Sequence, residues 1–144
     1  MQLAHIKDAW GMIAGFGMPV YASRISAGFP SPADDFIERS LDLNEYLVKH
    51  PSSTWFARAQ GDSLKHVGIF HDDLLIVDRA AERRQGAVVV AAVGGELVCR
   101  ILDLHNRRLL STLPDQQPLK LGEDEDALIE GVVVFSVRHH ARTG

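Results

Sequence analysis

A single serine in a polar turn is the residue of this chain best suited to nucleophilic chemistry. Ser63 belongs to a Gly-Asp-Ser-Leu run at residues 61–64 that precedes an apolar, strand-like run. A serine hydroxyl at such a turn becomes a nucleophile when a neighbouring group accepts its proton. Two other features accompany it: a polar, Pro-rich segment around the Ala27-Gly28 peptide bond, and Arg100 on a later apolar strand. The sequence therefore offers a candidate nucleophile, a candidate cleavage site and a cation.

The elements that must position these residues are predicted to be mostly β-strands. The apolar runs are short and are separated by Gly, Asp and Asn, which is typical of strands and turns. Strands are predicted at residues 54–59, 73–78, 86–93, 96–102, 107–112 and 128–138. The run at 87–93 is apolar on both faces, as expected for a strand buried between layers or lying at a dimer contact.

The N-terminal third is predicted to contain less regular structure. Apolar residues in the segment 2–18 could form one helical stripe, which its glycines weaken. Prolines then favour extended or turn structure around residues 27–28. Asp42 followed by Glu45 is a capping-box pattern, and it predicts a short helix over about 42–50.

Four blocks of sequence carry a family resemblance. They lie at residues 27–36, at 41–44 with 50–52, at 61–63 with 73–78, and at 91–93 with 95–96. In this order they resemble the UmuD branch of the LexA-type self-cleaving proteins, the accessory subunits of error-prone DNA polymerase V. The resemblance implies a mainly β, LexA/UmuD-like (signal-peptidase-like) fold with a short helix. It also implies an N-terminal arm at 1–27, removable by self-cleavage, and a peptidase-fold domain at 28–144.

The resemblance assigns roles to the candidate residues. In that family a serine attacks the peptide bond before a glycine, in its own chain or its dimer partner, and a buried neutral lysine takes the serine proton. Ser63 and the Ala27-Gly28 bond match these roles, but the lysine position falls on Arg100. Burial can lower a lysine pKa from about 10.4 by roughly 3 to 5 units, whereas an arginine that starts at about 12.5 to 13.8 stays protonated. We expect Arg100 to donate hydrogen bonds, to a carboxylate or an oxyanion, and the peptidase to be slow or inactive.

The histidines and acidic residues suggest weaker sites. A helical turn beginning at Ser63 would bring His66 within reach as an alternative base, although a solvated histidine is the ordinary interpretation. His71 with its two following aspartates resembles a ligand set, but a polar turn before a strand explains it better. The run 122–126 is interpreted as a solvated acidic loop rather than a cation site, and His139 and His140 as a frayed terminus. No metal and no cofactor is expected.

Composition limits the partners. At 144 residues and a formal net charge of -4, with scattered basic residues, the chain suits one domain with a short arm and has no face for direct DNA binding. It has no apolar run of about 18 residues and no secretion signal, so we expect a cytoplasmic protein without membrane contact. Cys99 is the only cysteine; we expect a buried thiol that points away from the face of Val98 and Arg100 and has no catalytic role.

Three functions remain open at this stage. The resemblance implies a homodimer that engages a Y-family polymerase and a RecA-type recombinase filament in the SOS response to DNA damage. This accessory subunit is the function we favour, and Arg100 suggests an alternative, a protease-dead regulator that forms mixed dimers with an active relative. A LexA-type repressor is disfavoured because only 27 residues precede the cleavage site, and a signal peptidase because there is no anchor. One sequence does not distinguish a natural Arg100 from an engineered one.

Overall fold

The computed structural model describes residues 2–4, 18–21, 37–122 and 128–141, with side chains from residue 40 onward within these ranges. The chain divides into two compact units, a larger one of Met1–Lys7 with His50–Gly144 and a smaller one of Asp8–Lys49. The predicted division after residue 27 follows the cleavage site rather than packing, and it stays a prediction.

The smaller unit contains a two-stranded antiparallel sheet and one short helix among its described residues. Strand β2 (Met18–Tyr21) pairs with β3 (Ile37–Leu41), and α1 (Leu43–Leu47) follows. The Asp42 side chain caps the helix by accepting a hydrogen bond of 3.0 Å from the Asn44 backbone N–H. The helix is shorter than the predicted 42–50 because Val48 adopts an extended backbone and ends it.

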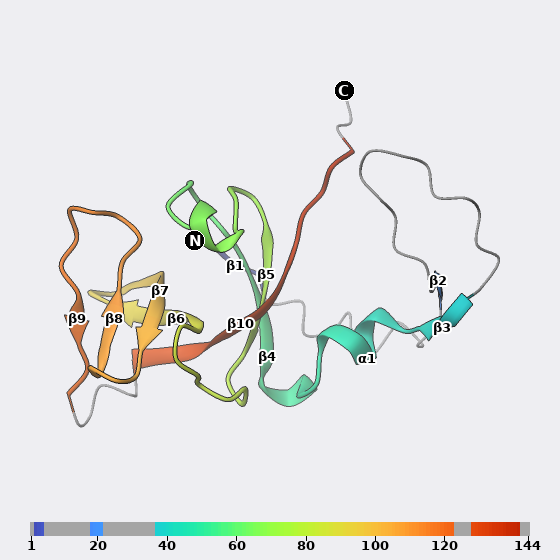
Figure 1. The fold of residues 1–144 in the computed structure, drawn as a ribbon, viewed down its shortest axis with the longest axis horizontal. Coiled ribbons are helices and arrows are strands. Elements are labelled where there is room, and N and C mark those ends of the chain that lie inside the picture. Colours follow the sequence, from blue (N-terminus) through green and yellow to red (C-terminus); the bar gives the residue numbers. More distant parts are fainter. Residues whose placement is uncertain (1, 5–17, 22–36, 123–127, 142–144) are drawn as a thin grey trace. The chain divides into compact units, whose positions relative to one another are not determined.

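The larger unit is an antiparallel sheet, with eight strands in the part of the chain that the structure describes. Their order is β1-β4-β5-β10-β6-β7-β8-β9 (Figure 1). The strands are β1 (Gln2–Ala4), β4 (Thr54–Arg58), β5 (Leu74–Asp78), β6 (Val88–Val93), β7 (Glu96–Asp103), β8 (Arg108–Leu110), β9 (Leu119–Lys120) and β10 (Ile129–Val137). Two 3-10 turns accompany them, η1 (Pro51–Ser53) and η2 (Lys65–Val67). The mainly β prediction is confirmed, and all six predicted strands are present with small shifts at their ends.

Strand β1 corrects one prediction. Residues 2–4 do not form the start of a helical stripe but pair with β4, with Leu3 opposite Ala57. The other edge of β4 is taken by β5. An open strand edge presents unpaired N–H and C=O groups, and pairing them outweighs a weak helical preference. The remainder of the predicted stripe lies outside the described residues, apart from Met18 in β2.

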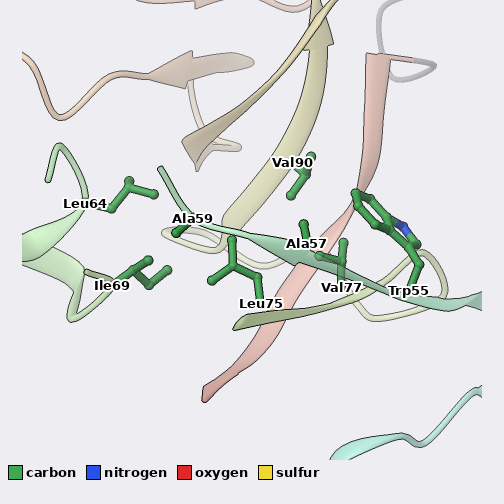
Figure 2. Packing of buried hydrophobic residues seen from close by; sticks show 8 residues of the cluster. All are labelled: Trp55, Ala57, Ala59, Leu64, Ile69, Leu75, Val77 and Val90. Atoms are coloured by element: carbon green, nitrogen blue, oxygen red, sulfur yellow. The ribbon is translucent and has the colours of Figure 1, made fainter. Parts of the chain in front are cut away.

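Strand β6, which is apolar on both faces, packs one face into each of two apolar clusters. Cluster 1 consists of Trp55, Ala57, Ala59, Leu64, Ile69, Leu75, Val77 and Val90 (Figure 2). Cluster 2 consists of Val89, Ala91, Leu102, Leu109, Leu121, Ile129 and Val132. Neighbouring residues of β6 enter opposite clusters, as strand alternation requires. The strand is therefore buried between layers of its own chain.

The hairpin of β7 and β8 is held by a buried carboxylate. Asp103 is 4% exposed and accepts hydrogen bonds from Asn106 Nδ2 at 2.9 Å, Arg108 Nε at 2.8 Å and Gln85 Nε2 at 3.0 Å. These hydrogen bonds, that of Asn106 foremost, hold the pKa of Asp103 well below its ordinary value. The end of β7 is consequently fixed, and so is the register that places Arg100 opposite Val89.

A glycine permits the close approach of β10 to β5. Gly131 has a φ of +154° and lies at an irregularity in the pairing of β10 with β6. A Cβ atom there would approach Val77 Cγ1 to 2.6 Å and the Asp78 carbonyl carbon to 3.2 Å. Neither the backbone conformation nor the space suits a larger residue.

We predict that Gly131→Ala lowers the free energy of unfolding by roughly 2 to 4 kcal/mol, because overpacking adds to backbone strain. Urea denaturation measures the change. Gly86→Ala is the matched control, since Gly86 also has a positive φ but open space around it; it should cost about 1 kcal/mol. Equal losses in the two variants would show that the close contact with Val77 is unimportant.

Candidate active site

Ser63 lies in the connection between β4 and β5, and its neighbours anchor that connection. Leu64 and Ile69 are 8% and 5% exposed and belong to cluster 1. Figure 2 shows both side chains directed toward Ala59 and Leu75. Ser63 is half-buried, between an exposed Asp62 and the buried Leu64. The serine is thus held at the surface by the apolar residues that follow it.

Two polar contacts fix the backbone on either side of the serine. The Gly61 N–H donates to His71 Nδ1 at 2.9 Å, and the Thr112 hydroxyl donates to the Ser63 carbonyl oxygen. The Ser63 hydroxyl itself makes no hydrogen bond to any other described residue. The backbone is therefore positioned while the hydroxyl is left available.

Ser63 and Arg100 line one pocket of about 140 Å³. The rest of the lining comes from the connection after β4 and from β7: Ala59, Gln60, Gly61, Leu64, Ile69, Leu97, Val98 and Cys99. Four consecutive residues of β7 contribute, although the side chains of a strand alternate between faces. Strand β8 pairs only with residues 101–103 of β7. The pocket therefore lies along residues 97–100 of β7, next to the stretch that pairs with β8.

Arg100 is half-buried and lies close to the backbone of its own strand. Its Nη1 donates to the Cys99 carbonyl oxygen at 2.9 Å. It has no ion pair with an acidic side chain in the described part of the chain. The guanidinium has five N–H donors and no acceptor, so it leaves donors free in the pocket but cannot take a proton from Ser63.

The predicted orientation of Cys99 is confirmed, although the residue is half-buried rather than buried. It packs against cluster 1, whereas Val98 packs against cluster 2, so the two side chains leave β7 on opposite faces. Cys99 pairs with Val90, and Arg100 pairs with Val89 on the cluster 2 side. Burial raises the pKa of the Cys99 thiol to about 11. The thiol is neutral at pH 7 and is a poor nucleophile despite its place in the pocket.

His66, the alternative base, lies in the exposed turn η2 and is not among the residues that line the pocket. The turn begins at Lys65, after the serine rather than at it. The Ala27-Gly28 bond lies outside the described residues, as do residues 123–126 of the acidic run. The roles of Ser63, Arg100, His66 and the cleavage site remain predictions.

Residues 71–72 form the turn that the sequence favoured over a ligand set. Among the described residues no group of three or more His, Cys, Asp or Glu side chains is arranged to hold a metal ion. His71 Nε2 lies 3.4 Å from Asp72 Oδ1, and Arg58 Nη1 donates to the Asp72 carbonyl at 2.9 Å. The two residues are therefore engaged with their own chain.

Asp73 and Arg138 form a buried ion pair that the sequence did not reveal. Arg138 Nε and Nη2 donate to the two carboxylate oxygens of Asp73, each at 2.9 Å, and Nη2 also donates to the Gly68 carbonyl. The guanidinium lies 4.0 Å from the centroid of the Phe70 ring. The hydrogen bond from Arg138 keeps the pKa of Asp73 below its ordinary value, although burial opposes this.

This pair anchors Arg138, the residue next to the predicted frayed terminus. Arg138, His139 and His140 are all exposed. The contact joins residues 65 positions apart. The only local sign of a role for Asp73 was its position as a polar residue directly before an apolar strand. No local pattern indicated the contact of Thr112 with Ser63, which lies 49 positions away.

A serine, a histidine and an aspartate that are separate from the Ser63 pocket lie together at the start of the larger unit. His50 Nδ1 lies 2.6 Å from Asp78 Oδ2, and the Ser53 hydroxyl donates to Asp78 Oδ1 at 3.2 Å. The serine therefore donates to the carboxylate and not to the imidazole, so this set lacks the serine-to-base contact of a hydrolytic triad. It instead attaches η1 to the end of β5.

The described residues place Ser63 and Arg100 on one pocket of a mainly antiparallel β-sheet. Residues 19–134 match the Peptidase S24-like family, and the chain belongs to this family of self-cleaving serine peptidases. It is 40% identical over 124 residues to protein ImpA of Salmonella typhimurium, covering 86% of this chain and 85% of ImpA.

Two other relatives extend the match. SamA of Salmonella typhimurium strain LT2 is 41% identical over 87% of each chain, and MucA of Escherichia coli is 38% identical over 94% of each chain. LexA repressor 1 of Pseudomonas putida is 34% identical over 85% of this chain and 61% of its own length. The resemblance to UmuD-type proteins is confirmed. None of the described helices is long and apolar enough to cross a membrane.

We predict that Arg138→Met lowers the free energy of unfolding at pH 7 by about 2 to 3 kcal/mol, because it leaves the Asp73 carboxylate buried without its partner. The loss should fall short of the usual 3 to 5 kcal/mol because Arg138 is partly exposed. Arg79→Met is the control: its ion pair with Glu130 is more exposed, and its loss should cost under about 1 kcal/mol. Urea denaturation measures both.

The same pair predicts a pH dependence. A carboxyl whose folded pKa is depressed stabilises the fold above the unfolded value, which is about 3.9 for aspartate, and this stability is lost as pH falls through the folded pKa. The difference in the free energy of unfolding between wild type and Asp73→Asn should therefore be largest near neutral pH, and it should become smaller below about pH 4. A gap that widens in acid would contradict the assignment.

Proposed function

We propose that this protein is an accessory subunit of an error-prone, translesion DNA polymerase in the SOS response, controlled by self-cleavage at the Ala27-Gly28 bond. The observation that carries the proposal is that Ser63 and Arg100 line one pocket, and the resemblance to UmuD-type proteins supports assigning them to the nucleophile and base positions. The similarity to ImpA, SamA and MucA over most of each chain supports it.

The proposed partners follow from the resemblance to UmuD-type proteins. The subunit acts in the cytoplasm as a homodimer and engages a Y-family polymerase. A RecA-type filament favours the arrangement in which the arm enters the pocket, and it supplies no catalytic group. Direct binding of DNA, which the charge of -4 disfavours, is not part of the proposal.

Each group of the site has one role in the proposed cleavage. The Ser63 oxygen attacks the carbonyl carbon of Ala27, its proton passes through a base to the departing amine of Gly28, and water then hydrolyses the ester. Arg100 donates to the oxyanion but accepts no proton, so the step that needs a base is impaired.

A second candidate function follows from the same residue. An uncleavable or slowly cleaved chain that still dimerises would hold an active relative and its polymerase in check. Such a chain can be a substrate in trans, because the bond that is cut and the serine that cuts it are separate features. A repressor role, suggested by the similarity to LexA repressor 1, would instead require specific binding to an operator.

We predict that incubation with an activated recombinase filament leaves the wild-type chain uncut or nearly so, whereas Arg100→Lys releases a fragment of residues 28–144. Lysine can lose its proton in a half-buried site and arginine cannot. Intact-mass analysis at neutral and alkaline pH identifies the fragment. Cleavage of Arg100→Lys should rise with pH, as its lysine becomes neutral.

The controls separate the explanations. Arg100→Lys combined with Ser63→Ala should give no fragment. Cleavage of the wild-type chain that is lost in Ser63→Ala would show that another group activates the serine, and His66→Ala then tests the alternative base. If Arg100→Lys remains uncut at every pH, the assignment of Arg100 to the base position is wrong.

A further inference from the structure

The backbone beside Ser63 donates a hydrogen bond to the imidazole ring of His71, a group that can gain a proton. The Gly61 N–H lies 2.9 Å from His71 Nδ1, across the connection that carries the serine. A backbone N–H can only donate, so Nδ1 must carry a lone pair and the proton of the neutral ring must lie on Nε2. The 3.4 Å approach of Nε2 to Asp72 Oδ1 agrees with this tautomer.

The position of the His71 ring is set by its own backbone turn. The Asp72 N–H donates to the Ala59 carbonyl at 2.8 Å, and Arg58 donates to the Asp72 carbonyl at 2.9 Å. Asp72 adopts a φ of +70°, which a tight turn requires. The turn is therefore attached to the end of β4, and the imidazole lies where the Gly61 N–H points.

We propose that His71 is a positioning residue for Ser63: its neutral ring fixes the turn of residues 61–63, and protonation of Nδ1 releases it. An imidazolium has donors at both nitrogens, so Nδ1–H would face the Gly61 N–H and the contact would become repulsive. The Thr112 contact at the Ser63 carbonyl does not titrate and would remain. The consequence for cleavage rests on the proposed function, whereas the contact itself does not.

Charges of both signs surround the ring. Asp72 and Asp73 lie on its own segment, Arg58 faces it from β4, and Arg138 and His139 approach from the end of β10. Asp73 is already paired with Arg138. His71 is exposed, so its substitution should not prevent folding.

The test is nuclear magnetic resonance of the uncleaved, ¹⁵N-labelled full chain between about pH 5 and 8. At the upper end of this pH range, we expect the ring nitrogen shifts of His71 to show an unprotonated Nδ1. We also expect the chemical shift of the Gly61 amide to follow the titration of His71. Exchange protection of the Gly61 amide, relative to its intrinsic rate, should fall about fivefold to tenfold on protonation. Titration of His71 without a change at Gly61 would overturn the proposal.

Two substitutions at the same position sharpen the test. His71→Asn retains an acceptor at the δ position and does not titrate, so protection at Gly61 should persist at all pH values. His71→Phe removes the acceptor, and protection should be lost at all pH values. His105→Asn changes an exposed histidine of the β7–β8 turn and should leave the Gly61 titration intact. Protection that survives in His71→Phe would refute the role of the ring.

Cleavage supplies a separate readout. In the Arg100→Lys background, His71→Phe should cut about fivefold more slowly at neutral pH, and His71→Asn should restore the rate. An equal rate in all three would show that the contact does not position the serine. If the Arg100→Lys chain does not cut, the proposed function fails, while the Gly61 measurements still decide whether His71 holds the turn.

Discussion

The charged contact between Asp73 and Arg138 fixes the connection that carries Ser63. Asp73 is 1% exposed, and its charge is compensated by Arg138, which binds both of its oxygens, and by the Phe70 backbone N–H, which donates to Oδ2 at 2.8 Å. The same guanidinium also binds the Gly68 carbonyl. One cation at the end of β10 therefore sets both the start of β5 and the loop before it, and the serine turn lies on the loop so defined.

The pocket lies next to the short pairing of β7 with β8. Strand β8 pairs with residues 101–103 of β7, and the segment after β8 reaches the Ser63 carbonyl through Thr112. Residues 97–100 of β7 line the pocket together with the connection that carries Ser63. The end of β8 and the pocket are therefore linked through one hydrogen bond to the serine backbone.

Much of the fold could be predicted from the sequence because most of its strands are apolar runs bounded by turn residues. The short strands were not predictable: β9 has two residues, and β1 depends on an edge that only the folded β4 provides. Ser63 and Arg100 were predictable as candidates from residue type and a family resemblance. Thr112 and Arg138 were not, because their contacts cross 49 and 65 positions and leave no local pattern.

The contacts of the Ser63 turn are separate from those of Arg100. The turn is held by Leu64, Ile69, His71 and Thr112, and Arg100 is bonded to its own strand rather than to the serine. The residue at position 100 can therefore change without removing any of the contacts that hold the turn. Under the proposed function, this separation means that cleavage depends on one proton acceptor, whereas the geometry of the turn depends on the sheet and its connections.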